Sequence, residues 1–308
     1  MAARKTAHVT EVTAPHATRI MTCANHKGGT GKTTTAVNVS AGLALLTQQR
    51  VLLVDFDPRG HASMALGVDS AHVRYSVTDL LTGAMTDWQA LCWEHGDNLH
   101  LLPANATLTD VALELGQSSE GRWRLHQALQ PLLDAFDFIL IDTPPTLGFL
   151  TQAPLVASTD LLIPVDVGYF ALAGMRQLLD AIARLRQEGP LTLATPHILL
   201  TKFDARTTLS AHVRALLREQ DGAAALHTVI RVNVALARAQ MARQSIFTYA
   251  RTSPGAQDYQ HVVEEILGNR SAVASSGPVI PFRPRGGAEV AGTSQGAGER
   301  LTQMHGSW

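Results

Sequence analysis

The sequence predicts an α/β fold in which helices flank a doubly wound, mostly parallel sheet within a single domain. Two observations predict it. Short, wholly apolar runs recur along the chain, and such runs are typical of strands buried on both faces of a parallel sheet. Between them lie longer stretches with apolar residues three and four positions apart, the spacing of a helix with one buried face. Strands that alternate with helices in this way form βαβ units with right-handed crossovers.

The expected elements follow one another from Arg19 to Asn269. Almost entirely apolar runs predict strands at 20–24, 51–54, 138–141, 161–165 and 198–201. Apolar spacing predicts helices at 33–46, 123–136, 171–185, 209–217 and 254–267. Pro254 stands at the start of the last helix, where proline is tolerated because the N–H it lacks would have no partner.

The two ends of the chain differ in composition from the part between them. Residues 1–17 are polar and rich in Ala and Thr, so we expect a flexible N-terminal arm. Residues 270–308 are rich in Gly, Ser, Ala and Pro, and such a segment cannot bury enough apolar surface to become ordered. The sequence therefore predicts a folded domain at 18–269, between an arm and a disordered tail.

The composition excludes several classes of protein. The 308 residues carry a formal net charge of -1, so any contact with DNA would need a local basic patch. The two cysteines, Cys23 and Cys92, are far apart, which argues against a disulfide scaffold and against cysteine-ligated zinc or iron–sulfur sites. There is neither an apolar run long enough to span a membrane nor the apolar core of a secretory signal. We expect a cytoplasmic protein.

A glycine-rich segment, NHKGGTGKTT at 25–34, lies between the first expected strand and the first expected helix. Glycines let the backbone turn its N–H groups toward phosphates, and the helix N-terminus adds a positive dipole end. Lys32 would reach the β- and γ-phosphates, and the Thr33 hydroxyl would ligate Mg²⁺. The segment therefore predicts ATP and Mg²⁺ as cofactors, with phosphate contacts from Gly28, Gly29, Thr30, Gly31, Lys32, Thr33 and Thr34.

Carboxylates follow two of the expected strands. Asp55 and Asp57 come after the run at 51–54, and Asp142 comes directly after the run at 138–141. The carboxyl ends of the strands form the edge at which α/β folds bind ligands. We predict that Asp142 holds Mg²⁺ and that Asp57 orients or deprotonates the attacking water. Taken singly, each of these residues fits a turn or loop cap equally well.

These motifs together resemble the deviant Walker-A ATPases of the ParA/MinD superfamily. The resemblance rests on KGGTGKTT, on DFDPRGHAS and on DTPP. The usual pattern GxxxxGK[ST] is not met literally, because His26 stands at its first glycine and Lys27 follows. LLTKFDARTTLS and the region 228–267 narrow the resemblance to the ParA/Soj branch, over Arg19 to Asn269.

The resemblance implies an ATPase that works as a dimer. Lys27 matches the family's signature lysine, which crosses the dimer interface to the partner's ATP, so that two ATP molecules are sandwiched between two subunits. The residue that matches Asp57 activates the hydrolytic water. Lys27, Lys32 and Asp57 are therefore the expected catalytic residues, and Lys27 joins the residues expected to bind ATP. A surface lysine beside the loop is the alternative for Lys27.

The resemblance also implies binding to double-stranded DNA without sequence specificity. Arg206 matches one arginine that the family uses for this, whereas a second family arginine falls on Ala235. The sequence leaves open whether nearby arginines replace it; these are Arg231, Arg238, Arg243 and Arg251.

The expected function is partitioning of a chromosome or plasmid on the nucleoid, together with a ParB-like activator. One alternative keeps the ATPase but gives it a protein cargo, such as a chemoreceptor cluster or a carboxysome. MinD-like membrane patterning is disfavoured, because it needs an amphipathic C-terminal helix and the tail is broken by Gly and Pro. We expect no membrane partner.

Overall fold

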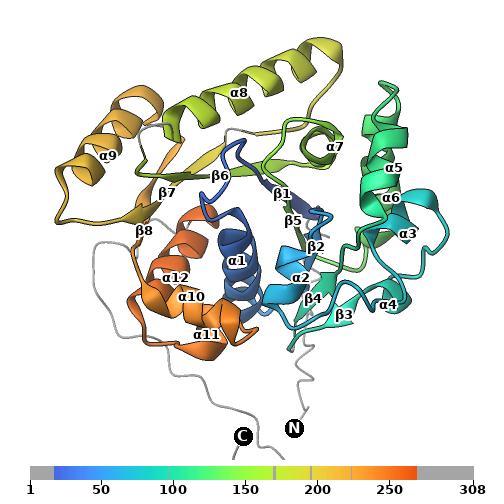
Figure 1. Cartoon of the computed structure of the whole chain (residues 1–308), viewed down its shortest axis with the longest axis horizontal. Helices are drawn as coiled ribbons and strands as arrows, with labels where there is room; N and C mark the ends of the chain where they lie inside the picture. The colour runs from blue at the N-terminus through green and yellow to red at the C-terminus, as the bar shows by residue number, and fades with distance from the viewer. Residues whose placement is uncertain (1–16, 97, 169–170, 195, 223, 269–308) are drawn as a thin grey trace, which may run out of the picture. The chain divides into compact units, whose positions relative to one another are not determined.

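A twisted sheet forms the centre of the protein in its computed structural model (Figure 1). The structure describes residues 17–268 except 97, 169–170, 195 and 223. The predicted tail at 270–308, and the predicted arm except for residue 17, lie outside the described residues. The strands are β1 (Arg19–Cys23), β2 (Val51–Asp55), β3 (Trp93–Glu94), β4 (Leu99–Leu102), β5 (Phe138–Asp142), β6 (Asp160–Asp166), β7 (His197–Phe203) and β8 (Ala225–Arg231).

The strand order is that of a doubly wound sheet. Within the described residues the eight strands follow one another as β3-β4-β2-β5-β1-β6-β7-β8. Neighbouring strands are parallel except for β3 and β4 at one end. The order reverses direction at β1, and such a reversal opens a crevice at the carboxyl ends of the strands. The predicted fold class is confirmed.

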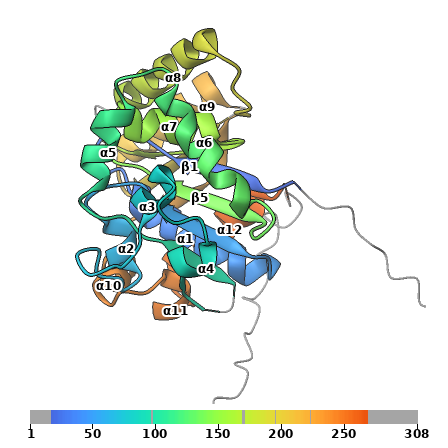
Figure 2. The same ribbon diagram turned by 90° about the vertical axis from the view of Figure 1, so that its right-hand side faces the viewer.

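Helices cover both faces of the sheet (Figures 1 and 2). One face packs against α1 (Lys32–Thr47), α2 (His61–Ala65), α10 (Val234–Met241), α11 (Ile246–Tyr249) and α12 (Pro254–Ile266). The other face packs against α3 (Val77–Thr82), α4 (Trp88–Leu91), α5 (Leu108–Leu115), α6 (Arg124–Leu129), α7 (Phe149–Ala157), α8 (Ala171–Glu188) and α9 (Thr208–Asp221).

The central strands are buried on both faces because their side chains alternate between two apolar layers. In β2, Val51 and Leu53 lie in the layer beneath α1, and Leu52 and Val54 lie in the layer beneath the opposite helices. Since side chains alternate with a period of two, a strand covered on both faces must be apolar at every position. This is why the continuous apolar runs in the sequence identify these strands.

One predicted helix is wrong. The stretch 123–136 is not continuous: a 3₁₀ turn, η1 (Gly121–Trp123), precedes α6, and a second, η2 (Gln130–Leu132), follows it. Pro131 explains the break, because proline lacks the N–H of the helical hydrogen bond and its ring clashes with the preceding turn. The other predicted helices are present, with ends that differ from the prediction by at most four residues.

Three strands and several helices were not predicted from the sequence. The strands are β3, β4 and β8, which lie toward the two ends of the sheet. No helix in the described part of the chain is long and apolar enough to cross a lipid bilayer.

Candidate nucleotide site

The loop between β1 and α1 has the backbone that its glycines permit. Gly29 and Gly31 have φ angles of 73° and 88°, in the left-handed region that other residues rarely adopt. Gly31 is the N-cap of α1. Thr30 is fully buried, and Lys32 is nearly so. The loop thus presents backbone N–H groups at the N-terminus of a helix, which is a favourable position for an anion.

Lys32 lies inside the curve of this loop. Its Nζ donates a hydrogen bond to the carbonyl oxygen of Lys27 at 3.0 Å. Burial lowers the pKa of Lys32, and the nearby Cys23 and Asp142 act in the opposite direction. A largely buried ammonium group with one neutral acceptor has the capacity to bind further anionic oxygens.

Asp142 and Asp55 are adjacent at the carboxyl ends of β5 and β2, and both are fully buried. Two hydrogen bonds of 2.8 Å from Ser63 satisfy Asp55, whose pKa burial nevertheless raises to about 6. Among the residues that the structure describes, neither oxygen of Asp142 has a hydrogen-bond partner. Burial and the charge of Asp55 raise the pKa of Asp142. The nearby Thr33 hydroxyl lowers this pKa, although no hydrogen bond of normal geometry joins the hydroxyl to the Asp142 carboxylate.

An unpartnered carboxylate in the interior is costly, and the usual solution is a cation. Asp142 lies near Thr33, and carboxylate and hydroxyl oxygens are the hard ligands that Mg²⁺ prefers. No cluster of three or more His, Cys, Asp or Glu side chains suited to a metal occurs within the described residues. The arrangement therefore fits Mg²⁺, which keeps several waters and binds protein through one or two groups plus phosphate.

Asp57 lies two residues beyond β2 and is paired with Arg59. The guanidinium of Arg59 contacts both carboxylate oxygens, with Nη2 2.7 Å from Oδ2 and Nε 3.1 Å from Oδ1. Asp57 is nearly buried, whereas Arg59 is exposed over about half of its side chain. We did not identify Arg59 from the sequence; the available signal was an arginine two residues after an aspartate in a turn.

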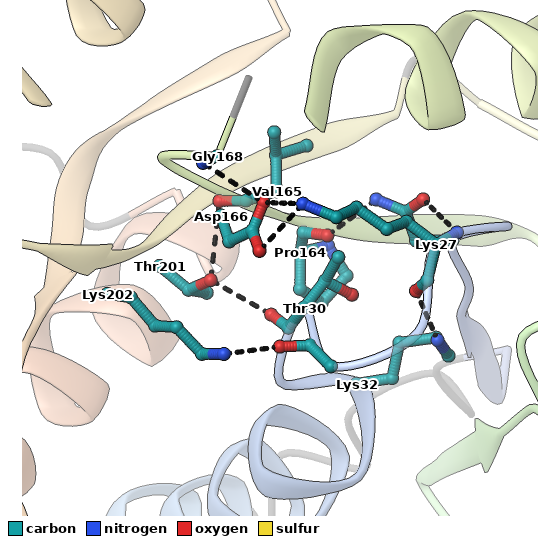
Figure 3. A network of polar contacts seen from close by, with 11 residues as sticks. Lys27, Thr30, Lys32, Pro164, Val165, Asp166, Gly168, Thr201 and Lys202 are labelled. Atoms are coloured by element: carbon teal, nitrogen blue, oxygen red, sulfur yellow. Dashed lines mark hydrogen bonds and ion pairs between the residues drawn. The ribbon is translucent and has the colours of Figure 1, made fainter. Parts of the chain in front are cut away.

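Lys27 points toward β6 of its own chain (Figure 3). Its Nζ lies 2.8 and 3.0 Å from the two carboxylate oxygens of Asp166, the last residue of β6. The side chain of Asn25 holds the backbone N–H of Lys27 at 3.0 Å. Asp166 was also missed in the sequence, although it ends an apolar strand in the same way as Asp142 does.

The end of β7 is joined to the loop by two further contacts (Figure 3). The hydroxyl of Thr201 donates to the carbonyl of Thr30 at 2.9 Å, and Lys202 Nζ donates to the carbonyl of Gly29 at 2.6 Å. Lys202 has a φ of 54°, at the place where the pairing of β7 with β8 shifts register. A cavity of about 380 Å³ lies here, lined by the loop together with Asp57, Arg59 and Lys202.

The predicted DNA-contacting residue lies on the same edge of the sheet. Arg206 is in the loop after β7; it is exposed over 87% of its side chain and forms two hydrogen bonds with Asp204. Ala235 lies in the first turn of α10, which follows β8. Of the nearby arginines, Arg231 is held by Asp258 at 2.6 Å. The structure therefore brings the loop and Arg206 to one edge, but it ties Arg231 to its own chain.

Comparison with known proteins places the chain in a family. A family model described as an AAA domain matches residues 18–194. The chromosome-partitioning ATPase Soj of Thermus thermophilus is 39% identical over 249 residues, which are 81% of this chain and 95% of Soj. The sporulation initiation inhibitor protein Soj of Bacillus subtilis is 36% identical over 251 residues, 82% of this chain and 99% of that protein.

Solved structures agree on the fold. Cobyrinic acid a,c-diamide synthase from Mycobacterium smegmatis has a TM-score of 0.70 and 30% identity, over 83% of this chain and 96% of that one. It has also been solved with an ATP analog and magnesium. McdA of Cyanothece has a TM-score of 0.72 over 82% of this chain and all of that one; at 22% identity this likeness concerns the fold alone. From its motifs, its fold and its similarity to Soj, the chain belongs to the ParA/Soj family of partitioning ATPases.

Proposed function

We propose that this protein is an ATPase that dimerises with ATP and Mg²⁺ bound, binds DNA without sequence specificity, and partitions a chromosome or plasmid with a ParB-like activator. The observation that carries the nucleotide part is the buried, unpartnered Asp142 near Thr33 and the phosphate loop. On this reading the protein acts in the cytoplasm, on the nucleoid.

The loop supplies the binding groups for the triphosphate. Backbone N–H groups of 28–34 and the ammonium of Lys32 bind the phosphates, and Thr33 and Asp142 hold the metal. When bound, Mg²⁺ neutralises charge on the β- and γ-phosphate oxygens. The protein's own contribution is a fixed arrangement of donors that needs little rearrangement as charge develops.

Hydrolysis needs a positioned water. The water oxygen bonds to the γ-phosphorus as the bond to the bridging oxygen of ADP breaks, so the products are ADP and phosphate. Asp57, which lines the cavity, is the group that we assign to orient this water or to accept its proton.

Lys27 has a different part in the proposal. In the family the matching lysine reaches the partner's nucleotide, and here Lys27 is bound to Asp166 of its own chain. Dimerisation therefore requires the Lys27–Asp166 ion pair to open. The phosphates of a bound nucleotide supply a competing anion of higher charge.

Two variants test these assignments and separate chemistry from assembly. For Asp57→Ala we expect ATP binding within about two-fold of wild type and turnover reduced by about 100-fold or more, the usual range for loss of a general base. For Lys27→Ala we expect ATP binding to remain and the ATP-dependent dimer to be lost. Titration with a fluorescent ATP analogue, phosphate release and sedimentation velocity measure the three quantities. If Asp57→Ala instead loses its nucleotide affinity, Asp57 is a binding residue.

A protein cargo is the second candidate function, and Ala235 favours it. The family's second DNA-contacting arginine is missing at this position, in the first turn of α10. An ATP-loaded protein that binds no random duplex DNA but is stimulated by a protein partner would support this candidate over DNA partitioning.

A further inference from the structure

We propose that Arg59 restrains Asp57 in the nucleotide-free protein and must release it before turnover, which makes Arg59 a positioning residue that limits the basal rate. This inference rests on the proposed function, because it concerns the carboxylate assigned to the attacking water.

The contacts of Arg59 occupy most of the acceptor sites of Asp57. Nε lies 3.1 Å from Oδ1 and 3.2 Å from Oδ2, Nη2 lies 2.7 Å from Oδ2, and the backbone N–H of Arg59 donates to Oδ1 at 3.1 Å. A carboxylate has about four acceptor sites in its plane. A water that is to be oriented by Asp57 must therefore take a site that Arg59 now fills.

A backbone hydrogen bond closes the turn around the pair, so a rotation of the exposed Arg59 side chain is the simplest movement that releases Asp57. The N–H of Gly60 donates to the carbonyl of Asp57 at 2.8 Å and closes the turn. Gly60 has a φ of 65°, and a Cβ there would lie 1.9 Å from the hydroxyl of Ser70. A release of Asp57 is thus a rotation of the Arg59 side chain rather than a change of the loop.

The surroundings of Arg59 favour such a rotation when a nucleotide binds. Its side chain is 55% exposed, against 4% for Asp57, so the arginine has room to move and the carboxylate does not. Arg59 and Asp57 line the same cavity as Lys32 and Thr33. Phosphate oxygens in this cavity offer a guanidinium an acceptor with more charge than one carboxylate.

The restraint predicts a faster enzyme when the arginine is removed. A partly exposed ion pair contributes little, so we expect basal turnover of Arg59→Gln to rise by up to about five-fold. Arg59→Lys keeps the charge but offers a single ammonium instead of a planar fork, so its turnover should lie between those of wild type and Arg59→Gln. The KM for ATP should rise by up to about three-fold in Arg59→Gln, because this variant also loses the contact of the released guanidinium with the phosphates, and by less in Arg59→Lys, which keeps the charge.

Arg50→Gln is the matched control. Arg50 is 52% exposed and faces Asp137, and it precedes β2 whereas Asp57 follows it. Its removal changes the net charge by the same amount, far from the cavity, and should leave turnover unchanged.

A measurement without nucleotide tests the pair itself. In the nucleotide-free protein the Nε–H proton of Arg59 should exchange slowly with water in NMR spectra, and this protection should be lost in Asp57→Ala. Loss of protection of the Arg59 Nε–H in Asp57→Ala, together with faster turnover in Arg59→Gln, supports the proposal. Unchanged or slower turnover in Arg59→Gln, a rise in KM alone, or rapid exchange in wild type overturns it. An inactive wild-type protein would refute the proposed function instead, and the exchange measurement would still report on the ion pair.

Discussion

Two buried aspartates, one at the carboxyl end of its strand and one at the amino end, show how neighbouring residues decide the role of a carboxylate. Asp142, at the carboxyl end of β5, has no hydrogen-bond partner for either oxygen within the described part of the chain. Asp160, at the amino end of β6, receives a 2.5 Å contact from Arg19 and a hydrogen bond of 2.7 Å from Thr159. The unsatisfied group fits a cation, whereas the satisfied one stabilises the fold.

The pH dependence of stability should report on Asp160. Burial alone would raise its pKa, but His197, Arg19 and Thr159 outweigh this and hold the pKa well below its usual range. A depressed pKa stabilises the fold above the unfolded-state pKa of about 4, and this stabilisation is lost progressively as the pH falls from that value through the lower pKa of the folded state.

For Asp160→Asn we therefore expect a loss of about 2 kcal/mol in the free energy of unfolding at neutral pH, the usual contribution of a hydrogen-bonded charged group. The loss should be complete above about pH 4 and should shrink only below it, as the pH falls toward the depressed pKa of Asp160 in the folded protein. Urea unfolding at several pH values between about 7 and about 2 measures the loss and its pH dependence. A deficit that does not shrink between about pH 4 and about pH 2 would show that the charge of Asp160 is not the cause.

At the scale of elements, the phosphate-loop helix α1 is joined to the C-terminal helices by amide side chains. Asn38 of α1 donates to the carbonyl of Thr34 at 2.8 Å and accepts from the N–H of Ile246, the first residue of α11, at 2.7 Å. Gln240 of α10 donates to the hydroxyl of Thr34 at 2.8 Å. The phosphate-loop helix α1 thus shares a hydrogen bond with α10, the helix that contains Ala235.

Asn38→Ala should destabilise the protein by about 1–3 kcal/mol, because it leaves the buried N–H of Ile246 without an acceptor. Urea unfolding of the nucleotide-free protein measures this. Gln260→Ala is the control: among the described residues, the Gln260 side chain bonds to Glu264 of its own helix, and its loss should cost less than about 0.5 kcal/mol. Equal effects of the two substitutions would contradict the argument.

The sequence predicted those elements whose local pattern reflects their environment. The central strands are covered on both faces, so their apolar runs identified them. β8 is only partly buried, with polar residues His227 and Thr228 in its middle, and it leaves no such run. In β4 the run is broken by His100, whose ring packs edge-on against Trp88 and Phe136. That contact joins segments far apart in the chain, which no local pattern contains.

The residues of the candidate site also fall into those that a local sequence pattern predicts and those that it does not. Lys32, Thr33 and Asp142 follow from a motif and from strand ends, because the glycine loop and the parallel strands fix their positions. The ion-pair partners of Lys27 and Asp57 cannot be predicted from a local pattern. Asp166 lies on another strand from Lys27, and the turn that Gly60 closes orients Arg59 toward Asp57.

At the scale of the whole molecule, the proposed DNA contact and the nucleotide site share the carboxyl-end edge of the sheet. The net charge of -1 provides no general attraction to DNA, so affinity has to come from a few local cations such as Arg206. Arg206 is paired with Asp204, and phosphates have to compete with that carboxylate.

Arg206→Ala should weaken binding of the ATP-loaded protein to random duplex DNA and reduce the slope of log affinity against log salt by about one. Fluorescence anisotropy over a range of salt concentrations measures the slope. Arg50→Ala removes an arginine that precedes β2, at the far end of a strand from this edge, and should leave the slope unchanged. An unchanged slope in Arg206→Ala would exclude a phosphate contact of this residue.

The contact between Lys202 and Gly29 bears on how the two sites communicate. Lys202, near the end of β7, donates a hydrogen bond to the Gly29 carbonyl of the phosphate loop. Arg206 follows four residues later, in the loop after β7, where its backbone N–H donates to Asp204. The left-handed backbone at Lys202 limits how far that segment is able to relax on its own. We therefore expect any shift of the Gly29 carbonyl on nucleotide binding to reach Arg206 along the few residues from Lys202, so that coupling of ATP to the proposed DNA contact needs no relay through the core.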